Sequence, residues 1–415
     1  MRIAIVGTGV SGLVCAHLLS RRHDVTVFEA DDRPGGHANT VRVDLPDETH
    51  EVDTGFLVYN QRNYPGLVRL FERLGVATKA SDMSFSVSDD VSGVEWRGTS
   101  LDSVFAQRRN VLRPAFLHML GEVVRFNRTA RELLQGPEDL SLSLAELLRS
   151  GRWSSPFVEW YLIPMGSSIW SADSRTFLDM PAVTFTRFFE NHGLLSYGDQ
   201  PAWSTVADGS RRYVEAILDP LGDAVRLSTP VAKVTRRHDG VELHSERGPE
   251  QFDQVVLAAH SDQALRMLSD PSTLEQQVLG AIRYQPNRAS LHTDDRLLPR
   301  NRRAWASWNY HRLADRPEVA TLTYRMRSLQ GIDSAHEILI ALNRDDAIRD
   351  DRVLARFDYA HPVFDVGAIA AQRRHDELNG SRRTWYCGAY RGYGFHEDGV
   401  QSALTVCRNL AGEEL

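Results

Sequence analysis

Residues 1–36 read MRIAIVGTGVSGLVCAHLLSRRHDVTVFEADDRPGG, and this stretch decides the fold. The apolar run Arg2–Val6 predicts a strand, Ser11–Ser20 predicts a helix, and Asp24–Phe28 predicts a second strand. The glycine turn Gly7–Gly12, GTGVSG, stands between the first strand and the helix. A strand, a GxGxxG turn, a helix and a second strand that ends in an acid are typical of a unit that binds a dinucleotide.

Each glycine of this turn has a physical task. Gly7 allows the tight turn, Gly9 lets the backbone approach a pyrophosphate, and Gly12 lets the helix lie close to the strand. The pyrophosphate then lies at a helix N-terminus, where free N–H groups and the helix dipole favour an anion. Glu29 ends the second strand and is placed to accept a hydrogen bond from a ribose 2′-hydroxyl. A plain tight turn is the alternative, and the acid and the two flanking elements favour nucleotide binding.

Length and composition limit the class of protein. The 415 residues exceed one typical domain, so we expect two. A formal net charge of −7 gives no electrostatic footprint for nucleic acid. The three cysteines (Cys15, Cys387 and Cys407) form no CxxC pair, which favours a reducing, cytoplasmic location, and no histidine spacing predicts a metal site. No stretch approaches the ~18 consecutive apolar residues of a membrane span.

A second motif, Arg33-Pro-Gly-Gly-His37, follows the acid. Together with Gly7–Gly12 and Glu29, it resembles the FAD fingerprint of the flavin-containing amine oxidase and phytoene desaturase superfamily. Within that superfamily, the chain is similar to a bacterial branch known only as NAD/FAD-binding or amine-oxidase-like. The resemblance implies that Glu29 holds the adenosine ribose and that the Arg33–Gly36 turn lies along the pyrophosphate and ribityl chain. His37 stands where many members carry an arginine.

The resemblance also implies an architecture. We expect an α/β fold in which a Rossmann-like FAD-binding domain of the glutathione-reductase type is intertwined with an α+β substrate domain. The FAD-binding domain would comprise residues 1–60, 205–286 and 370–415, and the substrate domain residues 61–204 and 287–369.

The C-terminal region carries a further motif, Arg391–Gly399 (RGYGFHEDG), before a helix predicted over Val400–Leu410. In the superfamily, such a helix aims its N-terminus at the flavin edge that carries negative charge in the reduced ring. We expect Asp398 to be the N-cap of this helix and Gly399 to allow a close approach.

We expect His396 and Tyr393 to lie nearest the chemistry. An imidazolium at His396 would raise the flavin reduction potential; the alternative is that His396 only packs the turn or caps the helix. The residues that the resemblance places at a non-covalently bound FAD come from six segments: Gly7, Gly9, Val10, Ser11, Gly12, Glu29, Ala30, Arg33, Gly35, Gly36, His37, Thr40, Gly55, Phe56, Val231, Ala258, Gly388, Ala389, Gly394, Phe395, His396 and Gly399.

The middle of the chain supplies the expected substrate domain. Residues 153–189 are the most aromatic stretch, and an apolar pocket lined by some of them is the default site, although most will be core. An antiparallel sheet over residues 287–342 would carry Trp305, Trp308, Tyr310 and Tyr324. Residues 100–136 predict a helical region with six arginines, which either form a solvated face or attract an anionic head group or carrier. His361-Pro362 predicts a structural turn.

Four functions remain open at this point. The first is an FAD-dependent oxidase or desaturase that removes a hydride from a small, largely apolar, fatty-acyl or lipid-like substrate, with possible peripheral contact with lipid. The second is an amine oxidase, which the absence of the lysine that many amine oxidases place near flavin N5 disfavours. The third is a redox-neutral isomerase of unsaturated fatty acids, and the fourth is a non-catalytic FAD-binding scaffold. The sequence gives no oligomeric state.

Overall fold

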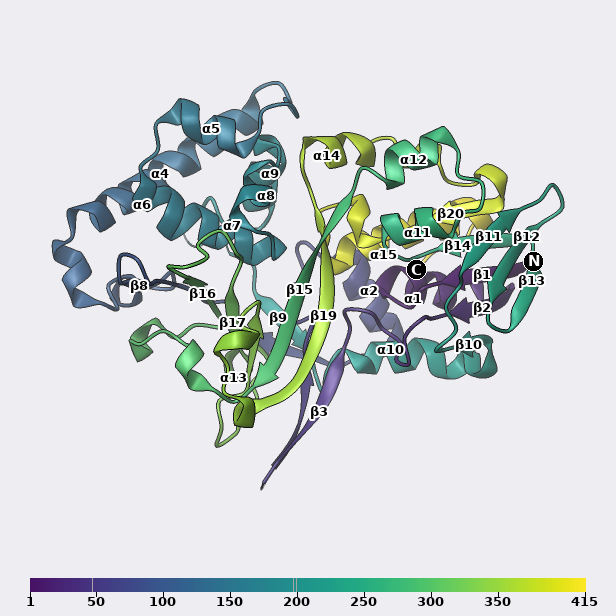
Figure 1. Cartoon of the computed structure of the whole chain (residues 1–415), viewed down its shortest axis with the longest axis horizontal. Coiled ribbons are helices and arrows are strands. Elements are labelled where there is room, and N and C mark those ends of the chain that lie inside the picture. The colour runs from purple at the N-terminus through teal and green to yellow at the C-terminus, as the bar shows by residue number, and fades with distance from the viewer. Residues whose placement is uncertain (47, 197, 199) are drawn as a thin grey trace.

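A parallel five-stranded sheet forms one end of the molecule (Figure 1). A computed structural model describes residues 1–46, 48–196, 198 and 200–415. The strand order is β10-β2-β1-β14-β20, and all four neighbouring pairs are parallel. The strands are β1 (Arg2–Val6), β2 (Asp24–Phe28), β10 (Val225–Arg226), β14 (Gln254–Leu257) and β20 (Thr384–Tyr386). The α/β class predicted from the first 36 residues is therefore confirmed.

The two faces of this sheet are covered by different layers because side chains alternate along β1. Ile3 and Ile5 pack in a core with helix α1 (Val10–Leu19), whereas Ala4 and Val6 pack in a second core on the opposite face. The first layer also contains α2 (Pro65–Leu74), α10 (Arg211–Leu218) and α15 (His396–Ala411). The second contains the antiparallel sheet β11 (Lys233–Arg236), β12 (Val241–Ser245) and β13 (Gly248–Phe252), with α11 (Ser261–Met267) and α12 (Thr273–Leu279).

A seven-stranded sheet forms the middle of the molecule, in the order β19-β15-β18-β17-β16-β7-β8. The strands are β7 (Phe85–Asp89), β8 (Val94–Arg97), β15 (Arg283–His292), β16 (Trp308–Arg312), β17 (Leu322–Arg325), β18 (Leu339–Leu342) and β19 (Val353–Val363). The expected antiparallel pairing over residues 287–342 is confirmed for β15, β18, β17 and β16. The sheet extends beyond that range, because β16 pairs in parallel with β7 and the long strand β19 pairs antiparallel with β15.

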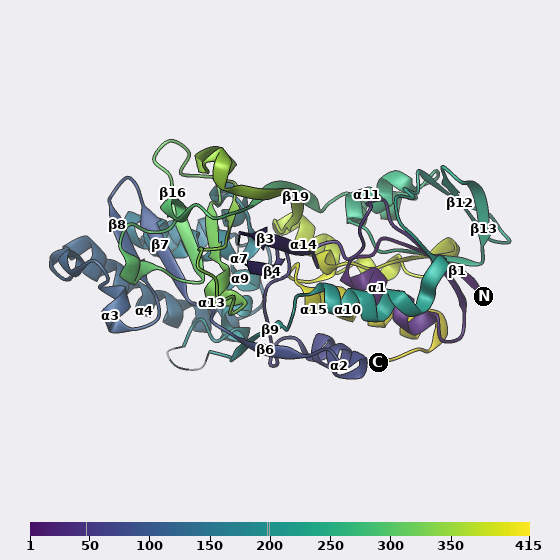
Figure 2. The ribbon, with the colours of Figure 1, turned by 90° about the horizontal axis from the view of Figure 1, so that it is seen from below.

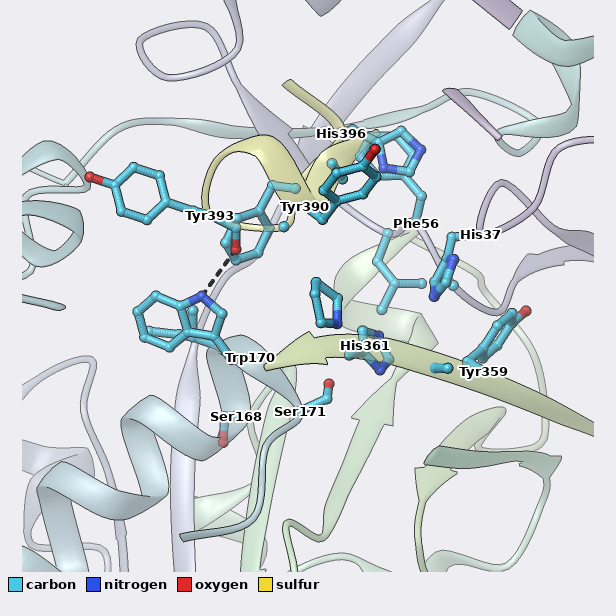
Figure 3. A pocket seen from close by; sticks show the side chains of 18 of the residues that line it. His37, Phe56, Ser168, Trp170, Ser171, Tyr359, His361, Tyr390, Tyr393 and His396 are labelled. Atoms are coloured by element: carbon cyan, nitrogen blue, oxygen red, sulfur yellow. Dashed lines mark hydrogen bonds between the residues drawn. The ribbon is translucent and has the colours of Figure 1, made fainter. Parts of the chain in front are cut away.

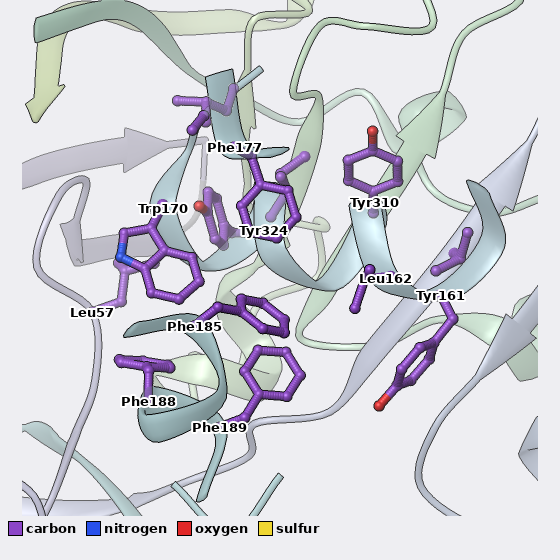
Figure 4. Close-up of a cluster of buried hydrophobic side chains, with 14 of the residues drawn as sticks. Leu57, Tyr161, Leu162, Trp170, Phe177, Phe185, Phe188, Phe189, Tyr310 and Tyr324 are labelled. Carbon is purple, nitrogen blue, oxygen red and sulfur yellow. The ribbon is translucent and has the colours of Figure 1, made fainter. Parts of the chain in front are cut away.

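Helices cover this sheet at the other end of the molecule (Figure 1). They are α3 (Leu101–Val104), α4 (Pro114–Gln135), α5 (Leu144–Gly151), α6 (Ser155–Phe157), α7 (Ile163–Trp170), α8 (Ser174–Leu178) and α9 (Ala182–Asn191). Their aromatic side chains form the largest core; Phe185 lies 4.0 Å from Phe189, between ring centroids, and 5.4 Å from Phe177 (Figure 4). A π-helical turn, η2 (Val158–Leu162), precedes α7.

Short elements connect the two ends. They are the hairpin β3 (Thr40–Leu45) and β4 (Glu48–Asp53), the small sheet of β5 (Tyr59–Asn60), β6 (Thr78–Ser81) and β9 (Trp203–Val206), and the helices α13 (Met326–Leu329) and α14 (Val366–Gln372). The predicted domain limits at residues 204 and 369 fall inside β9 and α14, and the division into domains stays a prediction. Within the described part of the chain, no helix has the length and apolarity needed to span a membrane.

Candidate functional site

One large cavity runs from the glycine turn after β1 to the helices α3 and α4. Its volume is about 1510 Å³, which exceeds the roughly 300–1,000 Å³ of a typical small-molecule pocket. The cavity can therefore hold a dinucleotide and a second molecule together. We call the part near β1, β2 and α1 the cofactor end, and the part between α4, α7 and the seven-stranded sheet the substrate end.

Glycines shape the cofactor end. Gly7 has φ +102° and donates its N–H to the carbonyl of Phe28 at 2.8 Å. A Cβ on Gly12 would lie 1.9 Å from the carbonyl oxygen of Gly7, so helix α1 packs against the turn only because residue 12 has no side chain. A Cβ on Gly9 would meet no atom within 4 Å, and Gly9 is the N-cap of α1 without a side-chain cap. The cavity wall at Gly9 is thus bare backbone at a helix N-terminus, which suits a pyrophosphate.

Glu29 lies at the carboxyl end of β2, on the wall of the cofactor end. One carboxylate oxygen accepts hydrogen bonds from the backbone N–H of Thr8, at 2.9 Å, and from the Thr8 hydroxyl. The other accepts from the N–H of Asp31 at 3.0 Å. These bonds orient the carboxylate beside the glycine turn, where a ribose would follow the pyrophosphate.

The side chain of Arg33 holds the turn after Glu29. Arg33 donates from Nη1 to the carbonyl of Gly36 at 2.9 Å, and Gly36 has φ +57°. The carbonyl of His37 accepts from the N–H of Phe56 at 2.7 Å, so residues 36–37 and 55–56 form adjoining parts of the cavity wall.

The structure brings most of the predicted cofactor residues to one cavity and leaves four outside its wall. Lining it are Gly7, Gly9, Val10, Ser11, Glu29, Ala30, Arg33, Gly36, His37, Gly55, Phe56, Val231, Ala258, Gly388, Ala389, Gly394, Phe395 and His396, together with Tyr393. Gly12 and Gly399 pack against neighbouring backbone and side chains, Gly35 packs against Ala38, and Thr40 donates to Asp53 at 2.6 Å. Contact with the cofactor stays a prediction for the lining residues.

The helix after the C-terminal motif begins earlier than predicted. α15 starts at His396 with Phe395 as N-cap, so Asp398 is not the N-cap. Asp398 instead occupies the third helical position and accepts from the N–H of Phe395 at 2.9 Å, which ties the first turn back to residues 393–395. Burial raises the pKa of Asp398 to about 7. The run Gly-Tyr-Gly favours a loop, and the hydrogen bond from the Phe395 N–H to Asp398 lets the helix begin directly after it.

His396 is buried between two aromatic side chains. Its ring stacks on Phe56 at 3.8 Å between centroids, and its Nε2 lies 3.1 Å from the hydroxyl of Tyr213. Burial lowers the pKa of His396 to about 3, so the imidazole is neutral at neutral pH. The expected imidazolium at the flavin edge is therefore wrong, whereas the alternative of a packing role agrees with these contacts.

Two residues that sequence reasoning did not place in the site lie opposite His396, on β19 (Figure 3). Tyr359 stacks on His37 at 4.8 Å between ring centroids, and His361 lies 5.2 Å from His37. His361-Pro362 is strand rather than turn, because β19 pairs with β15 through this dipeptide. The alternation of Ala355, Phe357 and Tyr359 with the polar residues Arg356 and Asp358 is a period-two signal that could have revealed the strand.

A hydrogen-bond chain fixes the protonation of His361. Asn343 donates to the amide oxygen of Asn287 at 2.7 Å, and the amide nitrogen of Asn287 lies 2.9 Å from Nδ1 of His361. Nδ1 is therefore the acceptor, and the proton resides on Nε2. Burial lowers the pKa of His361 to about 4 and that of His37 well below its usual value, so the centre of the cavity carries no histidine charge at neutral pH.

The substrate end is apolar. It is lined by Leu57, Val58, Met83, Phe85, Trp96, Leu101, Val104, Met119, Leu120, Val123, Val124, Tyr161, Met165, Ile169, Trp170, Phe188, Trp308 and Tyr324. Of the four sheet aromatics named from the sequence, Trp308 and Tyr324 line the cavity, whereas Trp305 and Tyr310 do not.

Few acidic residues line the cavity. Among the described lining residues, the carboxylates are Glu29 and Asp31 at the cofactor end and Asp358. The Asp358 side chain is 77% exposed and pairs with Arg288 at 2.9 Å, so it does not point into an enclosed site. The chain has two lysines, Lys79 and Lys233, and neither lines the cavity. Among the residues that the structure describes, the substrate end therefore offers no enclosed carboxylate for an ammonium group and no lysine.

The fold and this cavity define a dinucleotide-binding enzyme architecture, and comparison with known proteins identifies the family. The model of the family "flavin containing amine oxidoreductase" matches residues 10–327. The chain belongs to this family and is an enzyme of it, which confirms the resemblance seen in the sequence.

Individual relatives are more distant. L-amino-acid oxidase from Mus musculus is 26% identical over 320 residues, which is 68% of this chain and 46% of that protein, so the chain spans about half of its length. Cyclohexylamine oxidase from Brevibacterium oxydans has a similar fold, with a TM-score of 0.72, 16% identity and 99% of both chains covered. The CLA-producing fatty acid isomerase from P. acnes gives a TM-score of 0.69 at 16% identity, covering 99% of this chain and 98% of that one. These two likenesses show the fold alone.

The residues present fit the FAD that the family implies. The bare backbone at Gly9 and the uncapped start of α1 suit an anion, and the oriented carboxylate of Glu29 is a hydrogen-bond acceptor. The ring nitrogen Nε2 of His37 is buried without a hydrogen-bond partner in the structure. A polar group of a bound molecule at that place would supply the missing partner.

Proposed function

We propose that this enzyme binds FAD non-covalently and oxidises a largely apolar substrate, of which a fatty-acyl or other lipid-like chain is the first candidate. The observation that carries this proposal is the composition of the substrate end, which is apolar and aromatic and has no enclosed carboxylate among its described residues. A charged ammonium ion moved into such surroundings loses its hydration without a counter-charge, which costs several kcal/mol or more. A hydrocarbon chain gains from the same burial.

FAD, when bound, supplies the hydride acceptor for this chemistry. The side chains of the protein position the reacting carbon and exclude water. Phe56, Tyr359 and Trp170 offer flat apolar surfaces around the centre of the cavity (Figure 3), and His361 presents its Nε2–H as a neutral donor. A neutral histidine can hold a proton without adding charge, which suits a substrate whose reacting carbon is uncharged.

Non-covalent attachment is supported by the positions of the cysteines. Cys15, Cys387 and Cys407 are all buried in the core behind the parallel sheet, and none lines the cavity. Acid precipitation followed by chromatography of the supernatant tests this: FAD should appear in the supernatant, whereas FMN, no flavin, or colour retained by the precipitate would contradict the proposal. Because all three thiols are free, we also propose a cytoplasmic location.

Two alternatives have specific observations in their favour. The relatives named as oxidases of amino acids and amines favour amine oxidation, against which stand the missing lysine and the lack of an enclosed carboxylate among the described residues of the substrate end. The fold similarity to a fatty acid isomerase favours a redox-neutral isomerisation of an unsaturated chain in the same apolar cavity. A desaturase and an oxidase would share this site and differ in the electron acceptor. A non-catalytic FAD-binding scaffold would need the flavin but not the apolar cavity.

Anaerobic reduction of the bound flavin decides between these functions. Bleaching by saturated or unsaturated fatty-acyl compounds, with an oxidised product formed in equal amount, is the expected result. Bleaching by small primary amines alone would overturn the lipid assignment. Conversion of an unsaturated fatty acid to a positional isomer, with no net change in flavin, would establish the isomerase, and no response to any compound would favour the scaffold.

A further inference from the structure

An exposed apolar surface surrounds the outer opening of the substrate end. It is formed by α3, by the 3₁₀ turn η1 (Arg108–Leu112) and by the first half of α4. The large apolar side chains exposed there are Leu101, Val111, Leu112, Leu117 and Val124, and Leu112 and Leu101 are 86% and 80% exposed. We call these five residues the apolar rim. Five of the eight large apolar side chains exposed on the described chain belong to it.

The rim is continuous with the cavity. Leu101 and Val124 line the cavity and are exposed at the same time, so the cavity opens between α3 and α4. Leu117 and Val124 lie seven residues apart on α4, with Leu120 of the cavity wall between them, so all three share one face of the helix. Arg108 on η1 donates from Nη1 to the carbonyls of Asp102 and Phe105, which holds η1 against α3.

Arginines accompany the rim. Residues 101–132 contain six arginines and three acids, although the whole chain has a formal net charge of −7. Four of the arginines pair with carboxylates: Arg108 with Asp102, Arg125 with Glu122, Arg128 with Glu132 and Arg131 with Glu190. One of the acids, Glu122, is buried. Neither Arg109 nor Arg113 makes an ion pair with a described carboxylate, and Arg109 is exposed. Arg128 and Arg131 line a shallow hollow that shares Val124, Asn127 and Ser196 with the cavity.

From this combination we infer that the apolar rim docks on an anionic lipid surface and that the substrate enters the cavity from it. Exposed leucines and valines beside arginines are the pattern of elements that lie in a membrane interface, with apolar groups in the acyl layer and cations at the lipid phosphates. α3 and α4 lie at the end of the molecule opposite β12 and β13, so this contact leaves the cofactor end free (Figure 2). The entry of substrate rests on the proposed function, whereas the docking itself does not.

Vesicle sedimentation tests the docking with the flavin-loaded enzyme and without substrate. The protein should sediment with vesicles of equimolar phosphatidylcholine and phosphatidylglycerol, bind less as salt increases, and remain in solution with phosphatidylcholine alone. Leu112→Ser with Leu117→Ser should weaken binding about tenfold, since neither leucine lines the cavity. Arg109→Gln with Arg128→Gln should weaken it about 25-fold, at about fivefold for each arginine.

A matched control uses an exposed arginine and an exposed leucine elsewhere. Arg247 lies in the turn between β12 and β13, and Leu354 lies on β19. Arg247→Gln with Leu354→Ser should bind vesicles like the unmodified protein. Equal loss in the control, no binding to any vesicle, or binding that none of the rim variants changes would each overturn the inference. Capture of an acidic acyl carrier protein without vesicle binding would assign the arginines to a protein partner and would also overturn it.

Discussion

The two ends of the cavity are built from different parts of the chain. At the cofactor end, glycines and the start of α1 provide space and backbone N–H groups, and a large share of the wall comes from residues 6–37. At the substrate end, the wall is side chain, contributed by α4, α7, β16, β17 and β19 across more than 200 residues. A site made of backbone tolerates little change in sequence, whereas one made of apolar side chains can change its shape by substitution. The sequence motifs at the cofactor end therefore identify the family, whereas we expect the side chains at the substrate end to select the substrate.

The sharpest test of the backbone end compares two glycines three residues apart. Gly12→Ala should prevent folding, because the new Cβ would lie 1.9 Å from the Gly7 carbonyl oxygen. Gly9→Ala should fold normally, since φ is −61° and no atom lies within 4 Å of the new Cβ. It should nevertheless bind FAD about 100-fold more weakly, through loss of one or two charge-assisted hydrogen bonds of about 1.5–3 kcal/mol each.

Circular dichroism and a flavin titration measure the two effects separately. A Gly9→Ala protein that binds FAD with unchanged affinity would show that the pyrophosphate does not approach this backbone. A folded and stable Gly12→Ala protein would show that α1 does not pack as closely as the structure has it.

The same contrast explains what the sequence predicts and what it does not. The strand, turn and helix of residues 2–28 agree with the prediction because every interaction that defines them is local. Tyr359 and His361 were not placed in the site because β19 reaches the cavity only through pairing with β15, more than 60 residues away in the chain. The charge state of His396 was misjudged for a related reason. Its burial depends on Phe56 and Tyr213, which come from two other segments.

The second largest effect is expected at Asp398, where the two ends meet. Its pKa is about 7 in the folded protein against an ordinary value of 3.8, so the folded state holds the proton more tightly than the unfolded state does. The free energy of unfolding should therefore fall as the pH rises through this interval, by roughly 4 kcal/mol at about 1.4 kcal/mol for each pKa unit. Asp398→Asn keeps the acceptor for the Phe395 N–H and removes the ionisation.

Urea unfolding at about pH 4 and about pH 8 measures this contribution. The loss of stability between the two values should be smaller in Asp398→Asn than in the unmodified enzyme. Asp53, whose pKa burial raises to about 6, contributes with the same sign to both proteins and cancels in the comparison. Equal pH dependence in both proteins would mean that Asp398 is ionised in the fold.

The third test places a charge in the apolar end. Ile169 lies on α7, is half-buried and lines the cavity. Ile169→Asp should lower kcat/KM for an apolar substrate by about 30-fold, or roughly 2 kcal/mol, because the carboxylate must be desolvated when the chain binds.

Ile169→Asn is the matched control, since it has the same size without the charge and should lose less. FAD content should stay the same in both variants, because the residue lies far from the glycine turn. If Ile169→Asp left activity on fatty-acyl compounds intact, the substrate would not occupy this end of the cavity.

The smallest effect is expected at His396. Substituting this residue tests whether its ring acts through packing or through charge. His396→Gln removes the stacking on Phe56 and weakens the contact with the Tyr213 hydroxyl, which should lower the free energy of unfolding by about 1 kcal/mol. Tyr213→Phe removes the same hydrogen bond from the other side and leaves the stacking in place.

Because burial holds the pKa of His396 at about 3, the imidazole stays neutral from about pH 5 upward. The pH dependence of the flavin reduction potential should therefore be the same in both variants as in the unmodified enzyme. Spectroelectrochemical titration across this range decides the point. A potential that falls in His396→Gln only at the acidic end would restore the imidazolium, and the cavity would then carry a positive charge at the flavin.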